Sequence, residues 1–197
     1  MKVAFGIKAH SGWAALVVLG KRDGDFVVVD RRCIELVEDE WAKQPFHAAE
    51  DLEPNAGRDV VKRGVAAAHR IAVREMRAAM KRERARENEV TACAVLVGNP
   101  MPAWSVDEIL AVHFRMHKAE GVLFRDALAR AAEACGLRFI GISEKELDAH
   151  AQKAMAISLN NLQKTIASLG KSVGPPWGKD QKDASLAAMI ALEGKVK

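Results

Sequence analysis

The chain has 197 residues, of which 49% are hydrophobic and 28% charged, and its formal net charge is +4. This length suits one substantial domain and is short for two, while the absence of tyrosine argues against a base-stacking surface. No apolar run approaches the roughly 20 residues that cross a bilayer, so we expect no contact with a membrane. The three cysteines are far apart and no signal peptide is recognisable, and we therefore expect a cytoplasmic protein.

The first third of the sequence predicts an antiparallel meander. Apolar runs at residues 3–8, 13–19 and 26–36 are separated by short turn-forming segments, such as GKRDGD at 20–25. The acid-rich segment 37–57 that follows contains two prolines, and we expect it to be an ordered insertion or lid rather than a linker.

The rest of the sequence alternates helix and strand. The segment 58–87 carries apolar residues at helical spacing, and Thr91–Val97 is typical of a strand covered on both faces. Further elements are expected at 105–134 (helix, with a break near Gly121), 137–142 (strand), 144–169 (helix), 170–179 (Pro/Gly loop) and 180–192 (helix). The order β-β-β-α-β-α-β-α predicts one α/β domain over residues 1–197, with a mixed five-stranded sheet and helices on both faces.

Several short motifs succeed one another along the chain. Phe5–Lys8 is followed by Ser11–Ala14, His117–Gly121 precedes an apolar helix, and Asp180–Ala187 places two aspartates at the start of an alanine-rich helix. In this order the motifs resemble the RuvC-type crossover junction nucleases, a branch of the ribonuclease H-like superfamily. The resemblance covers nearly the whole chain and implies a ribonuclease H-like fold.

The resemblance also implies a two-metal site, from which this sequence departs. In that family four carboxylates hold two metal ions that cleave a phosphodiester. Carried over by position, the first carboxylate falls on Lys8, the second falls near 97–99, where no acid stands, and the closing pair falls on Asp180 and Asp183. Because Mg²⁺ needs several oxygen ligands, we expect a degenerate site without conventional nuclease activity. No cofactor is expected, although magnesium binding stays open.

Lys8 suggests a substitute for the metal. Its ammonium could pair with Asp183 or Asp180 and take the position that a metal would hold. Alternatively, Asp180 caps the last helix and Asp183 stands at the third position of a capping box. The two interpretations are compatible for Asp180.

Two other patterns could bind anions. In the loop 9–12, His10 and Ser11 stand where the related sugar-kinase and chaperone ATPases bind phosphate, although a simple hairpin turn explains the loop as well. On the long helix, cations at spacings of four, three, four and three form a basic row: Arg70, Arg74, Arg77, Lys81 and Arg84. The row could follow a phosphate backbone, or it could be a solvated face that pairs with the acids of 35–40 and 50–53.

The histidines give a weaker pattern. His113 and His117 share a helix face, and Glu120 could complete a trio of metal ligands. The residue after His113 is Phe114, so the general base of an HExxH zinc motif is missing. We therefore predict a solvent-facing or partly packed histidine pair without metal, and we expect His47 and Glu50 on a surface loop.

The leading functional prediction is a non-catalytic RuvC-like domain that binds nucleic acid or a protein partner, as a homodimer if it follows its relatives. One alternative is a hydrolase or nucleotide-binding protein that uses Lys8, His10, Asp180 and Asp183 in the same cleft. Another is an assembly subunit whose sheet edge or basic helix forms an interface.

Overall fold

A computed structural model describes residues 1–194 of the chain. Five strands form one mixed sheet in the order β3-β2-β1-β4-β5. The first three strands form an antiparallel meander, and β4 and β5 run parallel to β1. The strands are β1 (Lys2–His10), β2 (Trp13–Arg22), β3 (Asp25–Glu35), β4 (Glu89–Val97) and β5 (Arg138–Ser143). The predicted mixed five-stranded sheet is confirmed.

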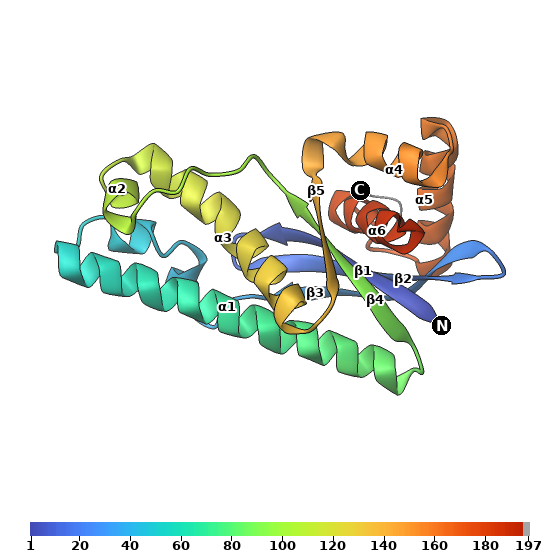
Figure 1. The fold of residues 1–197 in the computed structure, drawn as a ribbon, viewed down its shortest axis with the longest axis horizontal. Helices are drawn as coiled ribbons and strands as arrows, with labels where there is room; N and C mark the ends of the chain where they lie inside the picture. Colours follow the sequence, from blue (N-terminus) through green and yellow to red (C-terminus); the bar gives the residue numbers. More distant parts are fainter. Residues whose placement is uncertain (195–197) are drawn as a thin grey trace.

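Helices cover both faces of the sheet, as predicted (Figure 1). One face packs against α1 (Pro54–Ala85) and α3 (His113–Ala134). On the other side lie α4 (Leu147–Met155), α5 (Leu159–Val173) and α6 (Lys179–Glu193). Because β1 is covered on both faces, it is buried along nearly its whole length. Within residues 1–194, no helix is both long and apolar enough to span a membrane.

The helix α6 lies directly on the backbone of β1 at Gly6. A Cβ atom at this position would lie 1.8 Å from the carbonyl oxygen of Ala184 and 2.7 Å from the amide nitrogen of Ala188. Side chains of a strand alternate between its faces, so Lys8 points to the same side as Gly6. The close approach at Gly6 therefore brings the start of α6, with Asp183, over Lys8.

The insertion predicted at 37–57 is ordered, as expected; it ends where α1 begins at Pro54, and it folds against α1 and α3. It contains two short 3₁₀ helices, η1 (Glu40–Lys43) and η2 (His47–Ala49). Phe46 and Ala49 are buried beside Met116 and Ala119 of α3 in a small separate core. These contacts fix η2 against α3.

Two predicted helix boundaries in the middle of the chain are wrong. The helix α1 begins at Pro54 rather than near Arg58, because proline is favoured in the first turn, where its missing amide needs no partner. The helix expected from residue 105 is interrupted before His113, leaving α2 (Val106–Leu110), and it continues unbroken through Gly121. Buried neighbours on the same helix, such as Leu123 and Phe124, offset the roughly 1 kcal/mol that glycine costs inside a helix.

The segment predicted as one helix over 144–169 is divided in the structure. The first part, α4, ends at Met155, because Ala156 takes a left-handed conformation with a φ of 55°. The second part, α5, begins after Ser158, whose side chain accepts a hydrogen bond from the amide of Asn161.

The Pro/Gly loop predicted at 170–179 is shorter in the structure, since α5 continues to Val173 and α6 begins at Lys179, and it is anchored to the sheet. The guanidinium of Arg31, on β3, donates hydrogen bonds to the carbonyl oxygens of residues 173–176. Trp177 donates from Nε1 to the carbonyl oxygen of Ile166 at 3.1 Å. These contacts determine where α6 begins and so support its placement on β1.

Replacing Gly6 with alanine should lower the free energy of unfolding by about 3 kcal/mol, because the new methyl group forces α6 away from β1. Gly121→Ala is the control, since nothing lies within 4 Å of a Cβ built there. It should be neutral or stabilise the protein by up to about 1 kcal/mol. Urea denaturation measures both variants, and equal stabilities would contradict the close contact at Gly6.

Candidate functional site

Charged side chains gather where the parallel strands end. In an open α/β sheet, ligands bind outside the carboxyl ends of the strands, at the point where the strand order reverses. Here that point lies between β1 and β4, with β5 beside them. A cleft of about 400 Å³ opens at this edge, lined by residues 97–99, 143–145 and Lys179.

Lys8 is the centre of a group that we call the Lys8 cluster: Lys8, Arg125, Glu144, Lys179, Asp180 and Asp183. The Nζ atom of Lys8 lies 2.7 Å from Oδ2 of Asp183 and 2.9 Å from Oε1 of Glu144. It lies 3.5 Å from Oδ1 of Asp180. Only 8% of the Lys8 side chain is exposed. The ion pair predicted between Lys8 and Asp183 is present, and two further carboxylates share the ammonium.

The environment of Lys8 keeps it protonated. Burial lowers the pKa of Lys8, but the hydrogen bonds to Asp183 and Glu144 outweigh burial and raise this pKa above its ordinary value. A cation whose pKa is raised on folding stabilises the folded state fully below its unfolded pKa, and this contribution is lost only as the pH rises through the folded pKa. The contribution of Lys8 is therefore complete at neutral pH and is lost only in strong alkali.

Two further cations complete the Lys8 cluster. Lys179 forms an ion pair with Asp183, and Nη2 of Arg125 lies 3.6 Å from Oε2 of Glu144. At the end of β4, a Cβ built on Gly98 would lie 2.5 Å from Nη1 of Arg125. The guanidinium thus takes the space beside the position where the resemblance puts the second metal-binding carboxylate.

The Lys8 cluster does not fit a site for two magnesium ions. Mg²⁺ requires near-octahedral oxygen ligands at about 2.0–2.1 Å. The carboxylates of Glu144, Asp180 and Asp183 already contact ammonium or guanidinium groups. The charge of Lys8 stands where these carboxylates converge, so it would repel a divalent cation there.

Asp180 does not cap α6, so this interpretation of the sequence is wrong. The helix begins at Lys179, and its cap is Gly178, whose amide donates to Oε1 of Gln181 at 2.9 Å. Asp180 instead lies in the first turn, where the helix dipole favours a negative charge. From there it reaches Lys8 and His10.

The turn between β1 and β2 is the simple hairpin that the sequence allowed, with His10 paired to Trp13 and Gly12 at a φ of 84°. The ring of His10 stacks on Trp13, with 4.3 Å between centroids. Its Nε2 lies 3.2 Å from Oδ2 of Asp180, without the alignment of a hydrogen bond. Ser11 is exposed. Since Asp180 already supplies negative charge beside His10, the anion site at His10 and Ser11 stays a prediction.

The first part of the basic row pairs with an acid of the insertion. Nη2 of Arg70 lies 3.2 Å and Nη1 of Arg74 lies 2.6 Å from the carboxylate of Glu38. Glu38 belongs to the acidic segment 35–40 that the sequence offered as a partner. These two arginines are therefore partly neutralised.

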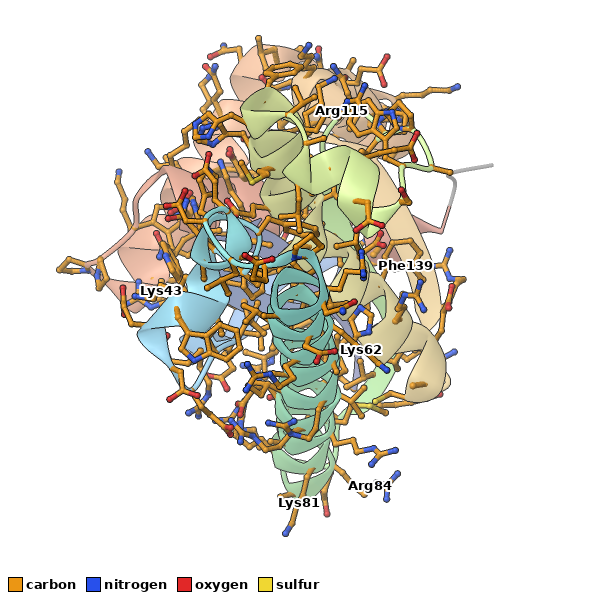
Figure 2. The ribbon with its side chains drawn as sticks, turned by 90° about the vertical axis from the view of Figure 1, so that its left-hand side faces the viewer. Lys43, Lys62, Lys81, Arg84, Arg115 and Phe139 are labelled. Atoms are coloured by element: carbon orange, nitrogen blue, oxygen red, sulfur yellow. The ribbon has the colours of Figure 1, made fainter. Side chains whose placement is uncertain are left out.

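The second part of the basic row is the trio Arg77, Lys81 and Arg84. All three are exposed, and none forms an ion pair within the described part of the chain, residues 1–194. Figure 2 shows Lys81 and Arg84 projecting from the end of α1, away from the other elements. This end lies beside the amino end of β1, because the amino group of Met1 donates to the carbonyl oxygen of Glu87. The trio and Lys8 thus lie near opposite ends of β1.

The histidines of α3 form more than the predicted pair. His47 of η2 joins His113 and His117, and one ring nitrogen of each lies within 4.8 Å of the others. The sequence treated His47 as part of a surface loop without a partner. The burial of Phe46 and Ala49 against α3 is what brings it there.

Comparison with solved structures agrees with this architecture. The structure is similar to that of Thermus thermophilus RuvC, with a TM-score of 0.51 and 14% identity over 97% of this chain and 93% of that one. It is also similar to T. thermophilus RuvC in complex with a Holliday junction substrate, with a TM-score of 0.53 and 11% identity over 98% and 94%. The chain has a RuvC-like, ribonuclease H-like fold. No protein-family model and no curated protein matches the sequence.

Glu144, Arg125 and Lys179 are the members of the Lys8 cluster that the sequence analysis missed, although Lys179 stands four residues before Asp183. The second carboxylate was sought after β4, whereas Glu144 follows β5, the neighbouring parallel strand. Carboxyl ends of adjacent parallel strands meet at one edge, so an acid directly after the fifth strand was a detectable signal. Arg125 gave no signal, because it lies in the middle of a long helix.

Lys8→Met should lower the free energy of unfolding by about 3 kcal/mol at neutral pH, since it leaves three carboxylates without their shared cation. The deficit should persist as the pH rises from neutral and shrink only in strong alkali, where Lys8 itself loses its proton. Lys21→Met removes the more exposed ion pair with Glu193 and should cost less than about 1 kcal/mol. Chemical denaturation at several pH values measures both; a Lys8→Met protein as stable as the wild type throughout is the contrary result.

Proposed function

We propose that this protein is a RuvC-like domain that lacks metal-dependent nuclease activity and binds nucleic acid along α1. The observation that carries the first half of the proposal is the position of Lys8. A buried ammonium contacts three carboxylates at the edge of the sheet where the nucleases of this fold hold metal. The protein therefore supplies its own cation in place of a metal ion.

The second half of the proposal rests on the exposed trio Arg77, Lys81 and Arg84. Most of the affinity of proteins for a duplex comes from cations that neutralise phosphates. The protein has no tyrosine, which favours contact with a phosphate backbone over stacking on bases. One of the similar structures, that of T. thermophilus RuvC, contains a Holliday junction. A protein partner and a homodimer stay predictions.

The basic trio lies beside the amino end of β1 and the Lys8 cluster at its carboxyl end. Nucleic acid would therefore bind away from the place where nucleases of this fold hold metal. A duplex that contacts α1 near Arg84 does not need Lys8. Substitutions at the two places should therefore have independent effects.

The triple variant Arg77→Gln/Lys81→Gln/Arg84→Gln should bind duplex or four-way-junction DNA at least about tenfold more weakly at low salt. The slope of log affinity against log salt concentration should fall by the equivalent of up to about three phosphate contacts. The matched control Lys153→Gln/Lys164→Gln/Lys171→Gln removes the same charge from exposed positions on α4 and α5 and should bind as the wild type. Fluorescence anisotropy at several salt concentrations measures both. No binding of wild-type protein at low salt would reject nucleic acid and leave a protein partner.

Lys8→Asp should raise the affinity for Mg²⁺ at least about tenfold, or about 1.4 kcal/mol, because it replaces the central cation with a fourth carboxylate. The thermal shift caused by added Mg²⁺ reports this affinity. Lys21→Asp makes the same charge change at a more exposed ion pair and should gain nothing. A Lys8→Asp protein that gains no magnesium affinity would count against a metal site in this position.

A further inference from the structure

Three histidine rings converge on one side of the molecule, where η2 meets the start of α3. The ring centroid of His47 lies 5.0 Å from that of His113 and 4.6 Å from that of His117. The centroids of His113 and His117 are 4.7 Å apart. Two of the rings are neighbours on one helix, and the third comes from the insertion, which a buried core holds in place.

Two carboxylates contact the Nδ1 atoms of two of these rings, those of His47 and His113. Glu120, whose side chain is 4% exposed, lies with Oε2 at 2.6 Å from Nδ1 of His47, and its Oε1 accepts the backbone amide of His47 at 3.1 Å. Oε1 of Glu50 lies 2.9 Å from Nδ1 of His113. Histidines that bind metals almost always donate their other ring N–H to a carboxylate or carbonyl in this way.

The carboxylates also decide which nitrogen of each ring is available. An ionised carboxylate only accepts hydrogen bonds, so the Nδ1 atoms of His47 and His113 carry the protons. In the neutral rings the Nε2 atoms then present lone pairs. Nε2 of His113 lies 3.1 Å from Nε2 of His117, so in the metal-free chain Nε2–H of His117 donates to this lone pair, and a metal ion that binds both rings takes the place of that proton.

The spacing of the nitrogens fits a tetrahedral metal. Zn–N distances of about 2.0–2.1 Å place two ligand nitrogens of a tetrahedral site about 3.3 Å apart. The separation of the Nε2 atoms of His113 and His117 is close to this value, and one ring nitrogen from each histidine falls within 4.8 Å of the others.

We propose that His47, His113 and His117 bind one zinc ion through their Nε2 atoms, with Glu120 and Glu50 orienting two of the ligands. Imidazole ligands suit zinc and other transition metals, whereas magnesium and calcium prefer oxygen. With three protein ligands, the fourth position is open to water. The site is independent of the proposed nucleic-acid binding and of the Lys8 cluster.

Zinc at this site would connect the insertion to α3. His47 is the ligand from η2, and the other two ligands come from the first turns of α3. The side chain of His113 is 59% exposed, so a metal ion can reach the site from solvent. A metal that binds only the folded chain raises its stability, and the increase depends on the metal concentration.

The test uses the full chain without a histidine tag, freed of metal by a chelator and titrated with Zn²⁺ alone against a chromophoric competitor. Wild-type protein should bind one zinc per chain, and zinc should raise its Tm. His113→Ala/His117→Ala should lose more than about a hundredfold in affinity, and Glu50→Gln about tenfold, as expected for loss of an orienting partner. Both histidines are exposed, so the double variant should keep the Tm of the metal-free wild type.

His150→Ala is the matched control. His150 is a half-buried histidine on α4 with a carboxylate neighbour, Glu146, four residues away. The control should bind zinc as the wild type does. The proposal is overturned if wild-type protein binds no stoichiometric zinc, or if the double variant keeps wild-type affinity, which would place the metal elsewhere, for example at the exposed Cys33.

Discussion

The buried ammonium of Lys8 determines how β1, β5 and α6 meet at one edge of the sheet. Without its charge, the partly buried carboxylates of Glu144, Asp180 and Asp183 would repel one another. With it, the helix start is drawn onto the end of β1, where Gly6 already removes the steric barrier. The ion cluster and the close packing thus depend on each other. This constraint fixes a buried cation among three carboxylates at the carboxyl ends of β1 and β5.

A second cluster, the histidines His47, His113 and His117, lies near the Lys8 cluster and differs from it in chemistry. The Lys8 cluster pairs carboxylates with cations, whereas the histidine cluster brings three imidazole rings together. The helix α3 contributes to both, through Arg125 to the first and through Glu120 to the second. These two residues, with His10 and Ser11, line one cavity of about 190 Å³ between the clusters. The insertion, which the sequence presented as a loop of unknown role, supplies the third ring.

Much of the fold could be predicted from patterns with a direct physical basis. Apolar runs located all the strands, and the order of strands and helices predicted the mixed sheet and its two covered faces. Helix ends were less predictable, because they depend on local competition that the periodicity does not reveal. Gly121 stayed helical since packing on both sides outweighed its low propensity, while Ala156, a good helix former, adopted a left-handed conformation and ended α4.

The sequence by itself predicted the mixed five-stranded sheet, placed a lysine at the end of the first strand and offered Asp183 or Asp180 as its partner, because position in a strand or helix defines the neighbourhood of these residues. Only the tertiary structure decided that Glu144 and Arg125 complete the Lys8 cluster, that half of the basic row pairs with Glu38, and that His47 meets the histidines of α3. These contacts join segments that are distant in the chain. Spacing along the chain gives at most the position of Glu144 after β5, and the other contacts arise from the packing of an insertion and of helices against the sheet.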